Sequence, residues 1–161
     1  MAKYTALLAC ALLLGCYSFR GQVAGDIKTL AIPTFTNESS EFGLSETVTD
    51  ELIRGFQKDG TLRIVPDNQA DAVLVGTLLD AKDEPYTARS GTEITVEEYR
   101  FSMTCRIELV IRETGETKWT QNFPAWAIYP YGGDLASREQ AVTEATTKLV
   151  EDLLNKIVGS W

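Results

Sequence analysis

The clearest hydrophobic pattern in the chain is an alternation of apolar and mostly polar residues between positions 99 and 112. The apolar set is Tyr99, Phe101, Met103, Cys105, Ile107, Leu109 and Ile111. Because successive side chains of a strand point to opposite faces, this pattern predicts a long antiparallel strand with one buried and one wet face. The segment "RETGETK" then predicts a hairpin turn around Gly115, and a return strand that breaks at Pro124 into an aromatic segment.

Two other segments repeat apolar residues at the spacing of one helical face. The first begins at Gly43 and stops at Gly60. Its repeating apolar residues are Leu44, Val48, Leu52 and Phe56. The second opens with Ser137 and Gln140 as a capping box and continues to Gly159. Both patterns predict amphipathic helices that pack against another layer.

Shorter apolar runs predict the remaining strands. Residues 27–33 form a buried first strand, residues 61–66 a short strand, and residues 71–82 a longer strand covered on both faces over part of its length. Residues 34–41 are expected to be a polar loop with several possible N-caps, and residues 83–91 an exposed loop. This order predicts one α+β domain, with two helices on one face of a mixed, largely antiparallel sheet of four to five strands.

The first fifteen residues have the layout of a secretory signal. Lys3 provides a positive start, and the stretch 4–14 is almost wholly apolar. At about a dozen residues, this stretch is too short to cross the hydrocarbon of a bilayer comfortably. We therefore expect a lipoprotein signal peptide at 1–15, a lipidated tether at 16–26 and a single domain at 27–161.

The motif Leu13-Leu14-Gly15-Cys16 matches the bacterial lipobox. In that motif the Cys16 thiol receives a diacylglycerol before cleavage, and two or more acyl chains such as palmitate suffice for stable anchoring. Cys10 fits the same pattern but would leave an apolar region of only about six residues. A plain secretory signal and a buried N-terminal helix are the other interpretations. Because Tyr17, rather than Asp, follows Cys16, proteobacterial-type sorting favours the periplasmic face of the outer membrane.

Composition removes several classes of chemistry. The chain has a formal net charge of −8, which argues against nucleic acid as a partner through bulk charge. It has no His, the commonest general base and metal ligand. We expect Cys105 to be a buried core residue rather than a nucleophile, and no cofactor beyond the acyl chains on Cys16. Acidic clusters at 80–84, 93–98 and 151–152 lack the spacing of a metal loop and are expected to be solvated surface.

Three arginines, Arg100, Arg106 and Arg112, share the wet face of the predicted long strand. They follow one another at intervals of roughly 20 Å, too far apart for one phosphate. One interpretation is a solvated sheet face; the other is a contact face for a phosphorylated glycolipid or an acidic partner wall. The aromatic run from Trp126 to Tyr131 likewise allows core packing or partner contact.

The order of segments resembles the LptE-type lipopolysaccharide-assembly lipoproteins. The segments that carry the resemblance are the lipobox with "CYSFRG", "IKTLAIPTFTNES", "GLSETVTDELIRGF", "DGTLRIV", "ADAVLVGTL" and "REQAVTEATTKLVEDLLNKI". The resemblance implies a domain of two helices on a mixed sheet, anchored by Cys16. It also implies lodging inside an LptD-type outer-membrane β-barrel as plug and assembly aid, with lipopolysaccharide as a second partner. Such a role needs no catalytic residue, so we expect no enzyme.

A second interpretation belongs to another class. The segment "LAIPTFTNES", a strand ending in a polar loop before a helix, also occurs in TolB N-terminal and penicillin-binding-protein-activator domains. It would make the chain a periplasm-facing regulatory lipoprotein that acts on an envelope complex.

Overall fold

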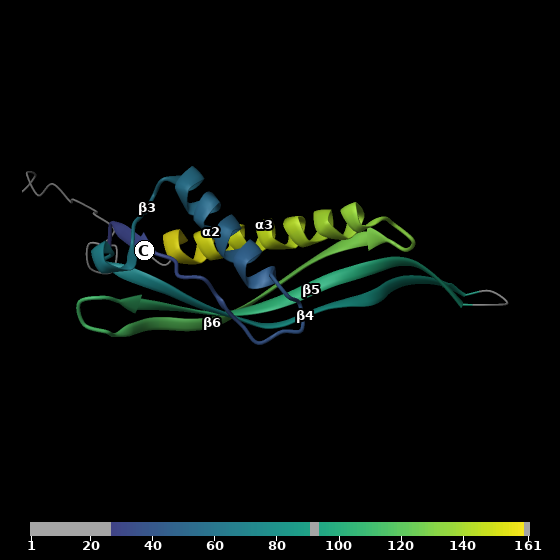
Figure 1. Ribbon diagram of the computed structural model, residues 1–161, viewed down its shortest axis with the longest axis horizontal. Helices are drawn as coiled ribbons and strands as arrows, with labels where there is room; N and C mark the ends of the chain where they lie inside the picture. Colours follow the sequence, from purple (N-terminus) through teal and green to yellow (C-terminus); the bar gives the residue numbers. More distant parts are fainter. Residues whose placement is uncertain (1–26, 91–93, 160–161) are drawn as a thin grey trace, which may run out of the picture.

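A computed structural model describes residues 27–90 and 94–159. Two helices, α2 (Leu44–Asp59) and α3 (Leu135–Gly159), lie together on one side of a six-stranded sheet (Figure 1). The α+β class and the single helical layer are therefore confirmed. Within the described residues, neither helix is long and apolar enough to cross a membrane.

The sheet has the strand order β3-β1-β4-β5-β6, with β2 paired to β4 off this path. Its strands are β1 (Thr29–Ala31), β2 (Thr36–Asn37), β3 (Arg63–Ile64), β4 (Ala72–Ser90), β5 (Ile94–Ile111) and β6 (Thr117–Pro130). The pairs of β1 and β2 are parallel, whereas β4, β5 and β6 are antiparallel. The sheet is thus mixed and largely antiparallel, as predicted. The strand beyond the expected four to five is the two-residue β2, which lies in the segment expected to be a loop.

Strand β4 runs much further than predicted. The expectation of an exposed loop over residues 83–91 is wrong, because β4 pairs with β5 as far as Ser90 opposite Ile94. Register shifts on both sides of Thr87, and one after Leu78, break the period that would have marked the strand. The last part of β4 and the first part of β5 project past the helical layer at the right of Figure 1. We call this projection, residues 82–90 and 94–100, the arm.

The prediction that the return strand breaks at Pro124 is wrong, because β6 continues through this proline. Pairing with β5 continues on both sides of this proline, with Pro124 opposite Thr104. Strand β6 is the edge of the sheet, where a residue without an N–H can be accommodated.

The core lies between the helices and one face of the long strands. Phe101, Cys105 and Ile107 on β5 are fully buried, as the alternation predicts. Strand β4 is covered on one face over most of its length rather than on both, since Val75 remains 43% exposed on the opposite face. At Gly76 of β4 an added Cβ would lie 2.2 Å from the Phe35 ring, so this glycine allows the ring to lie against the strand.

Helix α2 lies between Gly43 and Gly60 as predicted, whereas α3 begins at Leu135, before the predicted capping box. Gly43 precedes α2 with a left-handed backbone (φ 76°) and provides no side-chain cap. The polar side chains of the preceding loop instead bond within the loop: Asn37 donates to the Glu41 carbonyl and accepts from Ser39. At α3, the Asp134 carboxylate accepts the Ser137 N–H at 3.0 Å, so Asp134 caps the helix and the predicted capping box is wrong.

Candidate functional site

The three predicted arginines do not form one site. Arg100 lies on the arm and pairs with Glu84, with 3.0 Å between Nη2 and Oε2. Arg112 follows the end of β5 and pairs with Asp67 in the 3-10 turn Asp67–Gln69. Two of the three charges are therefore balanced within the protein.

Arg106 is the arginine that remains available. It is exposed on β5, opposite Thr77 of β4 on one side and Asn122 of β6 on the other. Within residues 27–90 and 94–159 it makes no ion pair at 4.0 Å or less. Both cross-strand neighbours are uncharged, so the guanidinium can meet an external anion without first breaking an internal bond.

The face of β4, β5 and β6 that points away from the helices is mixed in character, and we call it the open sheet face. The side chains on it are Val73, Val75, Thr77, Lys82, Glu84, Arg100, Ser102, Thr104, Arg106, Glu108, Asn122 and Trp126. In the described part of the chain no group of three or more acidic or cysteine side chains could hold a metal ion. The open sheet face thus combines apolar, uncharged polar and charged side chains.

The aromatic run at the end of β6 is divided between two surroundings. The Trp126 ring stacks with Tyr86 of the arm at 6.4 Å between centroids, and Lys148 of α3 lies 5.0 Å from the Trp126 centroid. Arg100 in turn lies over Tyr86 at 5.8 Å. These contacts hold the Trp126 ring against the arm and α3, although the residue stays 44% exposed. Sequence reasoning missed Tyr86 because it falls in the segment expected to be a loop.

The other half of the run belongs to a polar junction below the start of α3. The Tyr129 hydroxyl donates to Asp83 Oδ1 at 2.9 Å, and Arg138 donates to Asp83 Oδ2 at 2.9 Å. Arg138 also pairs with Glu41 at 3.0 Å. Burial, followed by the hydrogen bond to Asp83, raises the pKa of Tyr129 to about 12. This junction joins β4, β6, α3 and the loop before α2, and no spacing in the sequence indicates it.

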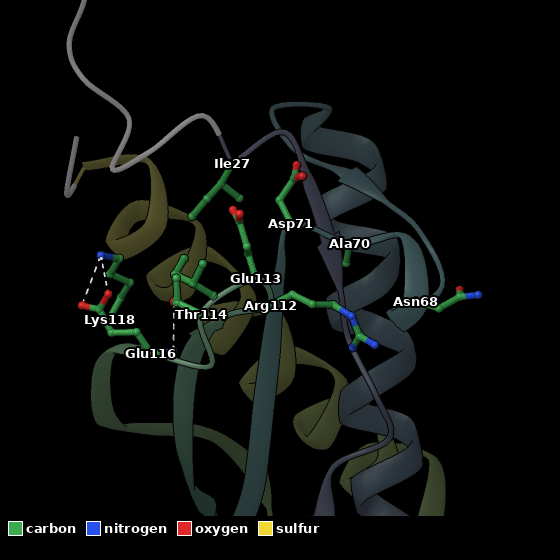
Figure 2. Close-up of a pocket in the computed structure, with 10 residues that line it drawn as sticks. Ile27, Asn68, Ala70, Asp71, Arg112, Glu113, Thr114, Glu116 and Lys118 are labelled. Atoms are coloured by element: carbon green, nitrogen blue, oxygen red, sulfur yellow. Dashed lines mark hydrogen bonds and ion pairs between the residues drawn. The ribbon is translucent and has the colours of Figure 1, made fainter.

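A polar recess of about 580 Å³ lies where the described chain begins, at Ile27 (Figure 2). Figure 2 shows Lys118 and Glu116 paired on one side of the recess and Arg112 turned to the other. Asp71 at its rim accepts hydrogen bonds from the Lys28 N–H at 2.9 Å and from the Thr29 N–H and hydroxyl at 2.8 Å each. These bonds, Lys28 first, lower the pKa of Asp71. Lys118 and Glu116 are thus paired with each other, whereas Arg112 pairs with Asp67 outside the recess.

The structure tests the prediction for Cys105 but not the prediction for Cys16. Cys16, with the leader and the tether, lies outside the described residues and stays a prediction. Cys105 is fully buried on the helix side of β5, and burial raises the pKa of its thiol to about 12. It is therefore a core residue and not an activated nucleophile.

Solved structures share this fold at low identity. Protein XCC0632 from Xanthomonas campestris has a TM-score of 0.58 at 10% identity, with 81% of this chain and 84% of that chain covered. The hypothetical protein CT253 from Chlamydia trachomatis has a TM-score of 0.56 at 12% identity, covering 81% and 98%. A minor lipoprotein from Acinetobacter baumannii has a TM-score of 0.53 at 12% identity, covering 83% and 94%. These likenesses show the fold alone.

Comparison of sequences gives a more specific result. No curated protein matches the chain. One family model does match, over residues 27–157, and its description is "LptE: Lipopolysaccharide-assembly".

Proposed function

The chain belongs to the LptE family of lipopolysaccharide-assembly lipoproteins of the cell envelope, and we propose that it is a non-enzymatic plug of an LptD-type outer-membrane β-barrel. In this role it occupies the barrel lumen and assists barrel assembly while lipopolysaccharide passes to the cell surface. The observation that carries the proposal is the family match over residues 27–157, which includes all six strands, α2 and all but the last two residues of α3.

Two properties of the described residues support a binding role without catalysis. The thiol of Cys105 is buried and protonated, and the chain has no His to serve as a general base. The polar junction around Arg138 and the carboxylate of Asp71 are used in holding elements together. A plug and assembly aid needs shape and surface chemistry instead, which the arm and the open sheet face supply.

We further propose that the open sheet face meets the inner wall of the barrel. Arg106 is the charged side chain best suited to this contact, because it is exposed and faces Thr77 and Asn122 rather than an acid. A guanidinium recognises a carboxylate of the wall or a phosphate of lipopolysaccharide by the same bidentate geometry. Both ligands are therefore compatible with Arg106.

Anchoring completes the proposal. We expect Cys16 to carry the acyl chains after removal of residues 1–15, which places the domain on the periplasmic face of the outer membrane. Intact mass spectrometry of the mature protein tests this: the N-terminal residue should be an acylated Cys16. Conversion of Cys16 to Ser should leave an unprocessed, unacylated chain.

Recovery of partners tests the main proposal. The tagged full chain, purified from detergent-solubilised outer membranes, should retain an LptD-type barrel, and its depletion should lower both assembled barrel and surface lipopolysaccharide. Normal levels of both would refute the plug role. Recovery of a peptidoglycan synthase or another envelope complex in place of the barrel would favour the regulatory interpretation.

A pair of charge reversals tests the contact face. Arg106→Glu should reduce barrel recovery several-fold, because it places a carboxylate where the wall presents its own acids. The control is Arg54→Glu, an exposed residue of α2 on the opposite side of the domain. Equal recovery of both variants would rule out the open sheet face as the contact.

A further inference from the structure

The free edges of the long strands contain an unusual number of prolines. The chain has five prolines, and three of them, Pro85, Pro124 and Pro130, lie inside β4 or β6. Over the arm β4 pairs with β5 on one side, and β6 is the last strand of the sheet. An unpaired strand edge is a template for another strand, because its N–H and C=O groups are free to bond.

A hydrogen bond from Lys148 shows which residues of β6 direct their backbone N–H and C=O groups outward, away from β5. Lys148 of α3 donates from Nζ to the Trp126 carbonyl at 3.2 Å, so this carbonyl points away from β5. In an antiparallel pair, the N–H and C=O of one residue point to the same side, and alternate residues point to opposite sides. The register of β5 and β6 is continuous from Glu98 to Leu109, so Pro124, Trp126 and Pro130 all face outward.

An independent bond agrees with this assignment. Tyr131, one residue after Pro130, donates its N–H inward to the Glu97 carbonyl at 2.9 Å. The direction of the backbone N–H and C=O groups therefore alternates from residue to residue to the end of β6.

Bonding groups are missing or engaged at each of these three outward positions. Pro124 and Pro130 have no N–H to offer a further strand. The Trp126 carbonyl is engaged by Lys148, and the Pro130 carbonyl accepts the Gly133 N–H at 3.1 Å. A strand laid along this half of β6 would find donors absent at positions 124 and 130 and acceptors engaged at positions 126 and 130, so that among the outward positions 124 to 130 Ile128 alone keeps both groups.

The outer edge of β4 in the arm also has a proline, Pro85, at a position that points away from β5. The Leu78 carbonyl accepts the Glu38 N–H at 2.9 Å and so faces away from β5. After the register shift, Asp80 stands opposite Thr104, an even-numbered residue of β5 that faces β4 and not β6. The backbone N–H and C=O of Asp80 therefore point toward β5. Because this direction alternates from one residue to the next, the backbone groups of Pro85 point outward. The donor missing from Pro85 is again one that a further strand would use.

We propose that Pro124, Pro130 and Lys148 form an edge guard that keeps a second copy of this chain from adding its β6 edge to edge; Pro85 lacks the same donor on the outer edge of β4. The guard acts in the free protein and goes beyond the plug role, since no barrel is involved. It keeps the protein in single copies and leaves the side chains of the strand faces, not the backbone edges, for binding.

The test restores the missing groups in the full chain, purified in detergent. The variants are the triple substitution Pro124→Thr, Pro130→Thr and Lys148→Gln, and the single substitutions Pro124→Thr and Lys148→Gln. The control is Asn122→Thr, because position 122 also faces outward and already has an N–H. Analytical ultracentrifugation should find the parent chain and the control as single copies. It should find concentration-dependent association in the triple variant, about tenfold stronger for each restored backbone bond.

Hydrogen exchange locates the association. The amides of residues 126 and 128 should exchange freely in the parent chain and should become protected in the associated triple variant, together with the amide that Pro124→Thr introduces. The proposal is overturned if the folded triple variant stays in single copies, if it associates without this protection, or if the parent chain itself pairs through β6. Should the triple variant not unfold cooperatively, the two single variants decide by the same measurements, since Lys148 lies on the surface of α3. No outcome depends on recovery of a barrel.

Discussion

Cys105 illustrates how the surroundings of one residue determine its chemistry. It lies on β5 between Leu78 and Phe123 of the adjacent strands, fully buried, and burial raises the pKa of its thiol to about 12. At pH 8 nearly all of the thiol is therefore protonated and unreactive. We expect iodoacetamide to leave the Cys105 peptide unmodified in the native protein and to modify it in urea, as read by mass spectrometry. Native labelling at the rate measured in urea would contradict this.

Substitution of Cys105 separates volume from polarity. Cys105→Ala removes one sulfur atom from the core and should lower the free energy of unfolding by about 1–2 kcal/mol. Cys105→Ser keeps the number of side-chain heavy atoms but buries a hydroxyl among apolar side chains, which should cost about 1–3 kcal/mol. Urea denaturation measures both. Barrel recovery should be unchanged for the Ala variant, since Cys105 is not exposed.

Asp71 gives the fold a defined dependence on pH. Its hydrogen bonds from Lys28 and Thr29 lower its folded-state pKa below the ordinary 3.8. The stabilisation is therefore present above about pH 4 and is lost as the pH falls through the folded-state value. Asp71→Asn should lower the free energy of unfolding at pH 7 by about 1 kcal/mol, a modest amount because the carboxylate is solvent-exposed.

Denaturation at several pH values checks this expectation. The difference between the parent chain and Asp71→Asn should shrink as the pH falls below about 3.8. The matched control is Asp152→Asn, an exposed carboxylate on α3 that lies far from the first strand in sequence. A difference that stays constant with pH would show that Asp71 acts through its shape and not its charge.

At the scale of elements, periodicity predicts what single-residue chemistry does not. The helices and β5 were predictable because their apolar residues repeat every four and every two positions. The glycines that bound α2, Gly43 and Gly60, were predictable too. The cap of α3 was not, because the Asp134 carboxylate accepts the Ser137 N–H, and a capping box at Ser137 does not form. The junction of Asp83, Tyr129 and Arg138 joins residues far apart in sequence, so no local pattern marks it.

Gly55 tests how closely the two helices pack. A Cβ at this position of α2 would lie 2.2 Å from Cγ1 of the buried Val150 on α3. Alanine normally favours a helix over glycine by about 1 kcal/mol, but overpacking costs about 1–3 kcal/mol. Gly55→Ala should therefore destabilise the protein by up to about 2 kcal/mol.

A double-mutant cycle provides the control for Gly55. Val150→Ala alone should also destabilise, through lost burial, but in the double variant the clash is relieved. The combined loss should be smaller than the sum of the two single losses by at least about 0.5 kcal/mol. Additive losses, measured by urea denaturation, would show that the helices separate freely and that Gly55 has no packing role.

At the scale of the whole molecule, the arm is what sequence reasoning most clearly missed. Pro85 and the polar residues around it are typical of a loop, and the register shifts beside Thr87 remove the alternation that marks a strand. The sheet is continuous there because β5 provides an unbroken partner. The earlier register shift, after Leu78, determines that the backbone of Pro85 points toward the free edge of β4.

Shortening the arm tests whether it serves binding or stability. Among the residues whose side chains are described, the hydrophobic core contains none between Ala81 and Phe101. Glu84 stands directly opposite Arg100, so replacing residues 85–99 with Asn-Gly should close a shorter hairpin. Because this removes the Tyr86 and Tyr99 ring stacks but no core residue, the free energy of unfolding should fall by only about 1–3 kcal/mol.

Thermal unfolding of the shortened chain should stay cooperative, while its recovery of the barrel should be lost. A shortened chain that still retains the barrel would confine the contact to the open sheet face, and one that melts without cooperativity would make the arm part of the fold itself.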